Sequence, residues 1–298
     1  MSAFTEEYPM DINSAGSPRY PVPLIALAPF LLITFGLAWG ILALYILLPG
    51  PMTAILGQLS GHHPLFILAV WSPAISAIIV IIRYVGLSGL RRYLSRMFLW
   101  HCPSAWYAFL LFVPLLFYAG AAVKGNLFTA PFPFTSLPAL LSAIAITLIL
   151  GPVEEFGWRG LALPLLQRRF APIWAGLILG GIWGIWHLPA FLLSGTPQSA
   201  WSFTPFLLGS VALSLIVTPL FNASQGSILL SYLFHFQLIN PIWPDAQPYD
   251  IFFFWVAAFA IVVINRKTMF RKAKAVTEVI PPAAKRGLTE DLTRETHP

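Results

Sequence analysis

The chain has 298 residues, of which 58% are hydrophobic and 9% are charged, and its formal net charge is +6. A soluble domain carries about 25% charged residues, so this composition excludes one and predicts a polytopic membrane protein. The basic residues lie in loops and after Asn265 instead of forming one basic face with interleaved aromatics. We therefore expect contact with lipid and no nucleic-acid partner.

The N-terminal segment, residues 1–22, contains Glu6, Glu7 and Asp11 and lacks the basic start of a secretory signal peptide. We expect it to stay in the mature protein as a cytoplasmic segment. The single cysteine, Cys102, excludes a disulfide within the chain and a cysteine metal cluster.

Apolar segments that are long enough to cross a bilayer, or nearly so, then follow one another along the chain. About 20 apolar residues suffice to cross. The segments run over 23–48, 64–84, 105–123, 137–162, 171–193, 203–221, 226–241 and 250–265. The sequence therefore predicts one all-α membrane domain, residues 23–265, with about eight transmembrane helices. We find no internal repeat, which disfavours an inverted-repeat transporter.

Loop charges predict the orientation of the chain. The loops near 49–63 and 194–202 contain no Lys or Arg, and the loop near 124–136 contains only Lys124. The other loops and the tail are basic: Arg91, Arg92, Arg96, Arg168, Arg169, Arg266, Lys267, Arg271, Lys272 and Lys274. By the positive-inside rule, both termini are cytoplasmic. The tail, residues 266–298, is expected to be basic and then disordered from about Val276. The compact size and short loops suggest a bacterial plasma membrane.

Three of the apolar segments contain ionisable residues, which are costly in a membrane and are functional candidates by default. "LILGPVEEFGWRGLALP" holds Glu154, Glu155 and Arg159, "GGIWGIWHLPAF" holds His187, and "GSILLSYLFHFQLIN" holds His235 and Asn240. The first two segments form a hairpin that turns near Phe170, and Glu154 and His187 each lie about 24–26 Å along their arms. We therefore expect these two side chains at the same depth, whereas His235 lies at a shallower position.

The spacing also predicts separate roles. Glu155 and Arg159 share a helix face and suit an ion pair, which leaves Glu154, about 100° around the helix, to face His187. Trp183 is expected to pack beside His187 and to help orient it. Glu154 would then activate water as a general base, and His235 with a nearby amide would stabilise an oxyanion. Glu154, His187 and His235 also match a zinc site, but the pairing of Glu155 with Arg159 favours chemistry without metal. A buried structural network is a further alternative.

These motifs resemble those of a known family. "EEFGWR" resembles the EExxxR motif of the CPBP family of intramembrane endopeptidases, which includes type II CAAX prenyl endopeptidases and bacteriocin-processing enzymes. "WGIWH" resembles its FxxxH motif, with Trp183 in place of phenylalanine, and the segment around His235 resembles its HxxxN motif. The resemblance covers residues 137–241, the motif core. It implies eight helices, a cavity open to the cytoplasmic leaflet, Glu154 as metal-independent base supported by His187, Glu155 and Arg159, and His235 with an Asn at the oxyanion.

One position departs from the family pattern. Ile239 stands where the family has its asparagine, and Asn240 follows one residue later. On a regular helix Asn240 lies about 140° around from His235, so a π-bulge or the end of the helix would have to bring it back. Gln237 and Asn222 are possible replacements.

The first hypothesis is an intramembrane, glutamate-dependent endopeptidase that needs no cofactor and cleaves a membrane-associated or prenylated peptide or protein. The alternative is a catalytically weak or inactive scaffold or chaperone that binds a peptide or lipid in the same cavity. A transporter with Glu154 and His187 as a proton relay is a third hypothesis.

Overall fold

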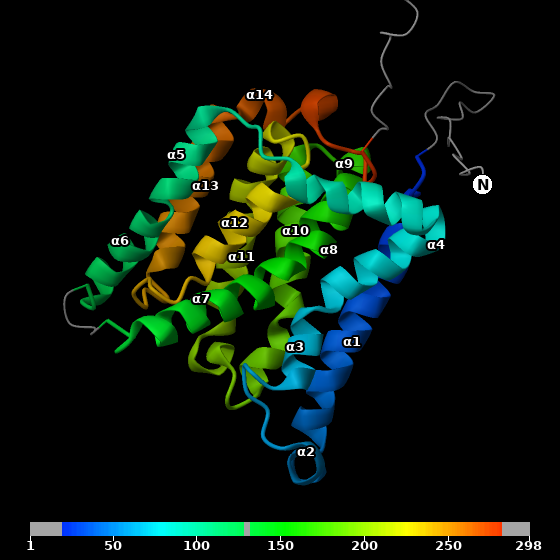
Figure 1. The fold of residues 1–298 in the computed structure, drawn as a ribbon. Helices are drawn as coiled ribbons and strands as arrows, with labels where there is room; N and C mark the ends of the chain where they lie inside the picture. Colours follow the sequence, from blue (N-terminus) through cyan, green and yellow to red (C-terminus); the bar gives the residue numbers. More distant parts are fainter. Residues whose placement is uncertain (1–19, 128–131, 282–298) are drawn as a thin grey trace, which may run out of the picture.

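The computed structural model describes residues 20–127 and 132–281, and within these ranges all regular secondary structure is helical. The predicted all-α fold is therefore confirmed (Figure 1). The expectations for residues 1–19 and for the end of the tail, residues 282–298, lie outside the described residues. The helices are α1 (Leu27–Leu47), α2 (Pro49–Leu56), α3 (Pro64–Val70), α4 (Ser72–Leu94), α5 (Ser104–Phe112), α6 (Pro114–Lys124), α7 (Leu137–Leu150), α8 (Glu155–Gly157), α9 (Leu163–Arg169), α10 (Pro172–Trp186), α11 (Phe203–Ala223), α12 (Ile228–Leu238), α13 (Asp250–Ile264) and α14 (Arg266–Met269).

Each predicted apolar segment coincides with helix in the structure. Six helical stretches of the described chain are long and apolar enough to cross a membrane, namely Leu24–Leu47, Ser72–Phe98, Ser104–Lys124, Leu137–Arg169, Pro172–Leu192 and Phe203–Ala223. The remaining two, α12 and α13, are apolar but shorter. A multi-pass membrane protein is therefore supported, and the count of eight spans stays a prediction.

A glycine breaks the helix of the second segment. Gly86 has φ 65° and ψ −169°, a conformation that only glycine adopts without strain. The helix before it matches the predicted segment 64–84. After Gly86 the chain bends, and the part that carries Arg91, Arg92 and Arg96 runs across the end of the bundle (Figure 1).

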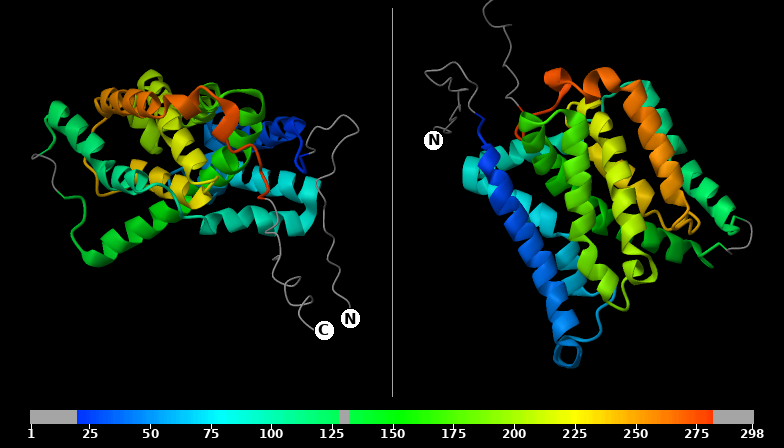
Figure 2. Two further views of the ribbon diagram at one scale, coloured as in Figure 1. Left: turned by 90° about the horizontal axis from the view of Figure 1, so that it is seen from above. Right: turned by 180° about the vertical axis from the view of Figure 1, so that it is seen from behind.

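The centre of the bundle is a close pair of helices, α10 and α11, which run side by side in both views of Figure 2. Glycines on α10 permit this approach. A Cβ atom on Gly180 would lie 2.7 Å from the Cα atom of Val211, and one on Gly184 would lie 2.6 Å from Leu207 Cδ1. Small residues at such contacts are typical of membrane helix packing. On the outer side of this pair, α11 packs against α13 and α13 packs against α6.

The two ends of the bundle differ in charge. The end of α4, the end of α9 and helix α14 lie together at one end, here called the basic end (Figure 1). The helix α2, the start of α3 and the loops 187–202 and 239–249 lie at the other, here called the opposite end. These segments contain no Lys or Arg, and Lys124, the last residue of α6, forms a 2.6 Å ion pair with Asp245 in the loop 239–249.

Residues 275–281, here called the tail strap, are bound to the basic end. The side-chain amides of Gln167 and Asn222 hydrogen-bond to each other at 3.0 and 2.7 Å, and both also bind the backbone of Val276. Val279 and Ile280 are buried. The expected disorder from Val276 onward is therefore wrong up to residue 281, because the backbone of the strap finds partners on the bundle.

Candidate functional site

The first motif does not lie on a regular α-helix. After α7 the chain forms a 3₁₀ turn, η3 (Pro152–Glu154), then the single turn α8, and then a π-helical turn, η4 (Trp158–Ala162). Proline at 152 removes a backbone donor, and π-turns are frequent at functional sites. This irregular stretch places both glutamates and Arg159 inside the protein, each with no more than 4% of its surface exposed.

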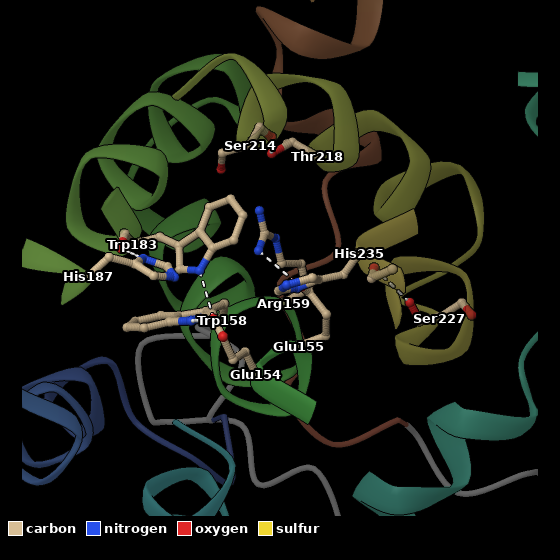
Figure 3. Close-up of polar contacts among 11 residues, drawn as sticks. Glu154, Glu155, Trp158, Arg159, Trp183, His187, Ser214, Thr218, Ser227 and His235 are labelled. Carbon is tan, nitrogen blue, oxygen red and sulfur yellow. Dashed lines mark hydrogen bonds and ion pairs between the residues drawn. The ribbon is translucent and has the colours of Figure 1, made fainter. Parts of the chain in front are cut away.

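Glu154 is held by two indoles. Its Oε2 atom accepts hydrogen bonds from Trp183 Nε1 at 2.8 Å and from Trp158 Nε1 at 3.3 Å (Figure 3). The other carboxylate oxygen, Oε1, has no hydrogen-bond partner among the described residues, and Glu154 lines a cavity. One oxygen is thus fixed, and the other is available to a water or a substrate.

Glu155 is the centre of a buried set of charged groups. Its Oε1 atom accepts hydrogen bonds from Arg159 Nη1 at 2.9 Å and from His235 Nδ1 at 2.8 Å. The ion pair predicted from the i, i+4 spacing is therefore present. The guanidinium of Arg159 also lies 4.9 Å from the centre of the Trp183 ring. His235 is thereby oriented by Glu155, and Figure 3 shows the three side chains together.

His187 is positioned by backbone. Its Nδ1 atom donates a hydrogen bond to the carbonyl oxygen of Trp183 at 2.8 Å, which leaves Nε2 as the acceptor of the neutral ring. The predicted packing of Trp183 beside His187 is present, with ring centres 5.6 Å apart. No hydrogen bond joins Glu154 to His187 among the described residues, but both side chains line the same cavity, as the depth argument predicts.

Asn240 lies beyond the end of α12. Its Oδ1 atom accepts a hydrogen bond from the backbone N–H of Ile242 at 3.0 Å, and the residue lines the cavity with His235. The end of the helix at Leu238 therefore brings Asn240 to the cavity wall. The two possible replacements lie elsewhere: Gln237 donates to the Leu110 carbonyl, and Asn222 binds the tail strap.

The cavity has a volume of about 580 Å³. Four of the six predicted site residues line this cavity, namely Glu154, His187, His235 and Asn240. The other two do not line it: Glu155 accepts a hydrogen bond from His235, and Arg159 donates one to Glu155.

Two residues at the end of α4 support the irregular turn from its far side. The Tyr93 hydroxyl donates to the carbonyl of Phe156, and Arg96 Nη1 donates to the carbonyl of Gly160 at 3.0 Å. Both side chains are buried. They bind carbonyls next to and within the π-turn, and so they help hold Glu155 and Arg159 in place.

Sequence reasoning missed Trp158, Tyr93 and Arg96. A signal existed for Trp158, which stands at i+4 from Glu154 and so shares its helix face. Tyr93 and Arg96 act through backbone carbonyls, which leave no pattern in the sequence.

Comparison with known proteins agrees with the motifs. Residues 136–239 match the family described as type II CAAX prenyl endopeptidase Rce1-like. The CAAX prenyl protease 2 of Methanococcus maripaludis is 26% identical over 164 residues, which cover 51% of this chain and 60% of that protein. The chain thus spans about three fifths of the length of this relative. Both matches confirm the resemblance of the motif core to the CPBP family.

Proposed function

We propose that the protein is an intramembrane endopeptidase in which Glu154 activates the water that hydrolyses a peptide bond. The observation that carries this proposal is the difference in hydrogen bonding between the two carboxylate oxygens of Glu154. One oxygen is fixed by Trp183 and Trp158, and the other has no described partner in a cavity that also holds two histidines. The family match and the relative, which is named as a CAAX prenyl protease, support the same activity.

The reaction begins with Glu154 as general base. It takes a proton from water while the water oxygen attacks the peptide carbonyl carbon, which gives a tetrahedral oxyanion. The C–N bond then breaks, and the proton held by Glu154 passes to the leaving nitrogen. His187, with Nε2 as acceptor, helps to position the water.

His235 and the side-chain amide of Asn240 stabilise the oxyanion, because both side chains line the cavity that contains Glu154. Glu155 accepts a hydrogen bond from His235 Nδ1 at 2.8 Å and so fixes the orientation of the imidazole ring.

The proposed mechanism uses no metal. Glu155 is bonded to Arg159 and His235, so its carboxylate is already engaged, and among the described residues no group of three or more His, Cys, Asp or Glu side chains is placed to hold a metal ion. Zinc held by Glu154, His187 and His235 is the competing mechanism, and a chelator separates the two.

The second candidate function is a membrane scaffold or chaperone that binds a peptide or lipid in the cavity without cleaving it. The displacement of Asn240 by one position favours this candidate, since it alters the oxyanion side of the family pattern.

The test is cleavage by purified protein in detergent, with a fluorogenic prenylated CAAX peptide and a library of membrane-anchored peptides as substrates. Wild type, Glu154→Gln and Glu278→Gln are compared, each with and without EDTA. Glu278→Gln is the matched control, since it makes the same chemical change in the tail strap, away from the cavity.

We expect cleavage by wild type and by the control that survives EDTA, and a loss of at least 10³-fold in Glu154→Gln, on the order of the contribution of a general base. Loss in EDTA with recovery on addition of zinc would replace the metal-free mechanism. Failure of folded wild type to cleave any of the peptides would favour the scaffold.

A further inference from the structure

We propose that residues 87–98, here called the interfacial arm, lie in the membrane surface at the basic end and bind anionic lipid headgroups. By this contact the arm fixes the turn that carries Glu155 and Arg159. The lipid contact is argued from the arm itself, whereas its effect on catalysis rests on the proposed function.

The arm runs along the membrane surface and not through the bilayer. Residues 64–85 precede the bend at Gly86 and supply the about 20 predominantly apolar residues that a crossing needs. After the bend the arm runs across the end of the bundle (Figure 1). It consists of the last part of α4 and the 3₁₀ turn η2 (Ser95–Phe98). The arm therefore lies at the level where the crossing helices end.

An exposed apolar stripe runs along the arm. Leu87 and Leu94 are two helical turns apart and so share a face, on which they are 72% and 37% exposed. Phe98 at the end of the arm is 81% exposed, and Trp100, which follows it, is 56% exposed. An apolar face with tryptophan at its end is typical of a helix that lies in the interface of a bilayer. This stripe fits the acyl chains just below the headgroups.

A polar and basic flank lies beside the stripe. Ser88, Arg91 and Ser95 are all exposed, and Ser88 is turned by about 100° from its apolar neighbour Leu87. The charge of this region has one sign, because residues 12–153 contain no Asp or Glu. Basic residues beside an interfacial apolar face attract anionic lipids. The flank is therefore complementary to the phosphates of such headgroups.

The buried face of the same arm holds the proposed site. Tyr93 and Arg96 are 0% and 1% exposed. The Tyr93 hydroxyl donates to the carbonyl of Phe156, and Arg96 Nη1 donates to the carbonyl of Gly160 at 3.0 Å. Gly160 leaves no room for a Cβ atom beside the Tyr93 hydroxyl, so arm and turn are in close contact. A shift of the arm therefore moves the backbone on both sides of the charged groups.

The two faces connect the lipid to the catalytic turn. A ligand that binds one position of a segment raises the population of that position. Anionic lipid on the exposed face holds the arm in the position in which Tyr93 and Arg96 reach their carbonyls. The lipid thereby acts on kcat through the placement of the site, and it leaves KM nearly unchanged because the arm does not line the cavity.

The position of the arm is tested with nitroxide spin labels in a Cys102→Ser background. The protein is placed in phosphatidylcholine vesicles that contain about 30% phosphatidylglycerol. Leu87→Cys and Phe98→Cys label the two ends of the stripe, Ser88→Cys labels the flank, and Lys274→Cys is an exposed control outside the arm. Collision rates are measured with oxygen, which partitions into lipid, and with a water-soluble nickel chelate.

We expect the ratio of oxygen to nickel collisions at both ends of the stripe to be at least about threefold higher than at the flank and at the control. Equal ratios at all four positions would overturn the inference. So would a high ratio at Leu87→Cys with a low one at Phe98→Cys, because the arm would then leave the membrane surface.

The effect on the site is tested by cleavage in vesicles with and without phosphatidylglycerol. Wild type, Arg91→Gln and Arg271→Gln are compared, and Arg271→Gln is the matched control, since it removes an exposed charge of the basic end outside the arm. We expect phosphatidylglycerol to raise kcat about fivefold in wild type and in the control, but less than twofold in Arg91→Gln. An equal response of the three proteins, or a change in KM alone, would contradict the role of the arm.

Two readouts separate this inference from the proposed function. Collision rates need no cleavage, and neither does thermal unfolding of the same three proteins in the two kinds of vesicle. We expect phosphatidylglycerol to raise the unfolding temperature of wild type and Arg271→Gln more than that of Arg91→Gln. A protein that shows these differences but cleaves no peptide would refute the peptidase and keep the lipid contact, whereas equal shifts would refute the lipid contact.

Discussion

The indole nitrogen of Trp183 lies 2.8 Å from Oε2 of Glu154, so the second sequence motif donates a hydrogen bond to the carboxylate of the first. The same ring contacts Arg159 and His187. Trp183 is therefore the side chain that joins the proposed base to the other charged groups of the site.

Replacing Trp183 by phenylalanine keeps a ring at this position and removes the donor. Loss of a hydrogen bond to a charged group corresponds to about 1.5–3 kcal/mol, or roughly a ten- to 150-fold decrease in kcat. Peptide cleavage with separate determination of kcat and KM checks this expectation. Trp186→Phe is the matched control, because the Trp186 indole N–H has no partner among the described residues. Equal effects of the two substitutions would contradict the role of Trp183.

The buried pair of Glu155 and Arg159 gives a prediction about stability. Arg159→Met leaves a buried carboxylate without its main partner, and removing one partner of a buried ion pair costs about 3–5 kcal/mol. Glu155→Gln combined with Arg159→Met removes both charges and should recover most of that loss. Unfolding in detergent of the two single variants and the double variant measures the coupling. Additive losses would show that the pair is not coupled.

The close approach of the site helix to α4 depends on Gly157. A Cβ atom there would lie 2.6 Å from the carbonyl oxygen of Pro73, and a backbone atom cannot move aside easily. We expect Gly157→Ala to destabilise the protein by about 1–3 kcal/mol, as overpacking does, and to reduce cleavage. Gly181→Ala is the control, since nothing lies within 4 Å of its added Cβ. Thermal unfolding compares them, and equal unfolding temperatures would refute the clash.

The tail strap predicts a difference between two truncations. Ending the chain after Lys274 removes the backbone partners of Gln167, Arg168 and Arg96. It also removes the buried side chains of Val279 and Ile280 and so exposes the apolar surface that they contact. Ending it after Pro281 keeps them. We expect the shorter chain to unfold at a temperature at least about 4 °C lower, which corresponds to about 1–2 kcal/mol for a domain of this size. Coincident unfolding curves would show that the strap contributes nothing.

The sequence predicted those parts of the site that depend on local spacing. The pairing of Glu155 with Arg159 follows from their i, i+4 positions, and the shared cavity of Glu154 and His187 follows from the equal arms of a hairpin. The bond from His235 to Glu155 was not predicted, because it joins residues 80 positions apart. Spacing on an ideal helix also could not show the 3₁₀ and π turns that redirect the carboxylates.

The tail strap escaped prediction for a different reason. Its position depends on which surfaces remain uncovered once the helices have packed, and it is held through its backbone carbonyl and amide groups. Contacts to backbone atoms do not depend on the side chains of the strap, so the sequence of residues 275–281 gives no sign that they bind the bundle.

The tail strap also has a consequence for biosynthesis. Residues 275–281 leave the ribosome after every helix described here. Arg96, which donates to the Gly160 carbonyl beside the proposed catalytic groups, also donates to the carbonyl of Glu278 in this strap. A chain that is interrupted before this point has all of its motifs but lacks the last contact that fixes them. Synthesis of the chain through residue 281 would therefore be a condition for full assembly of the proposed site.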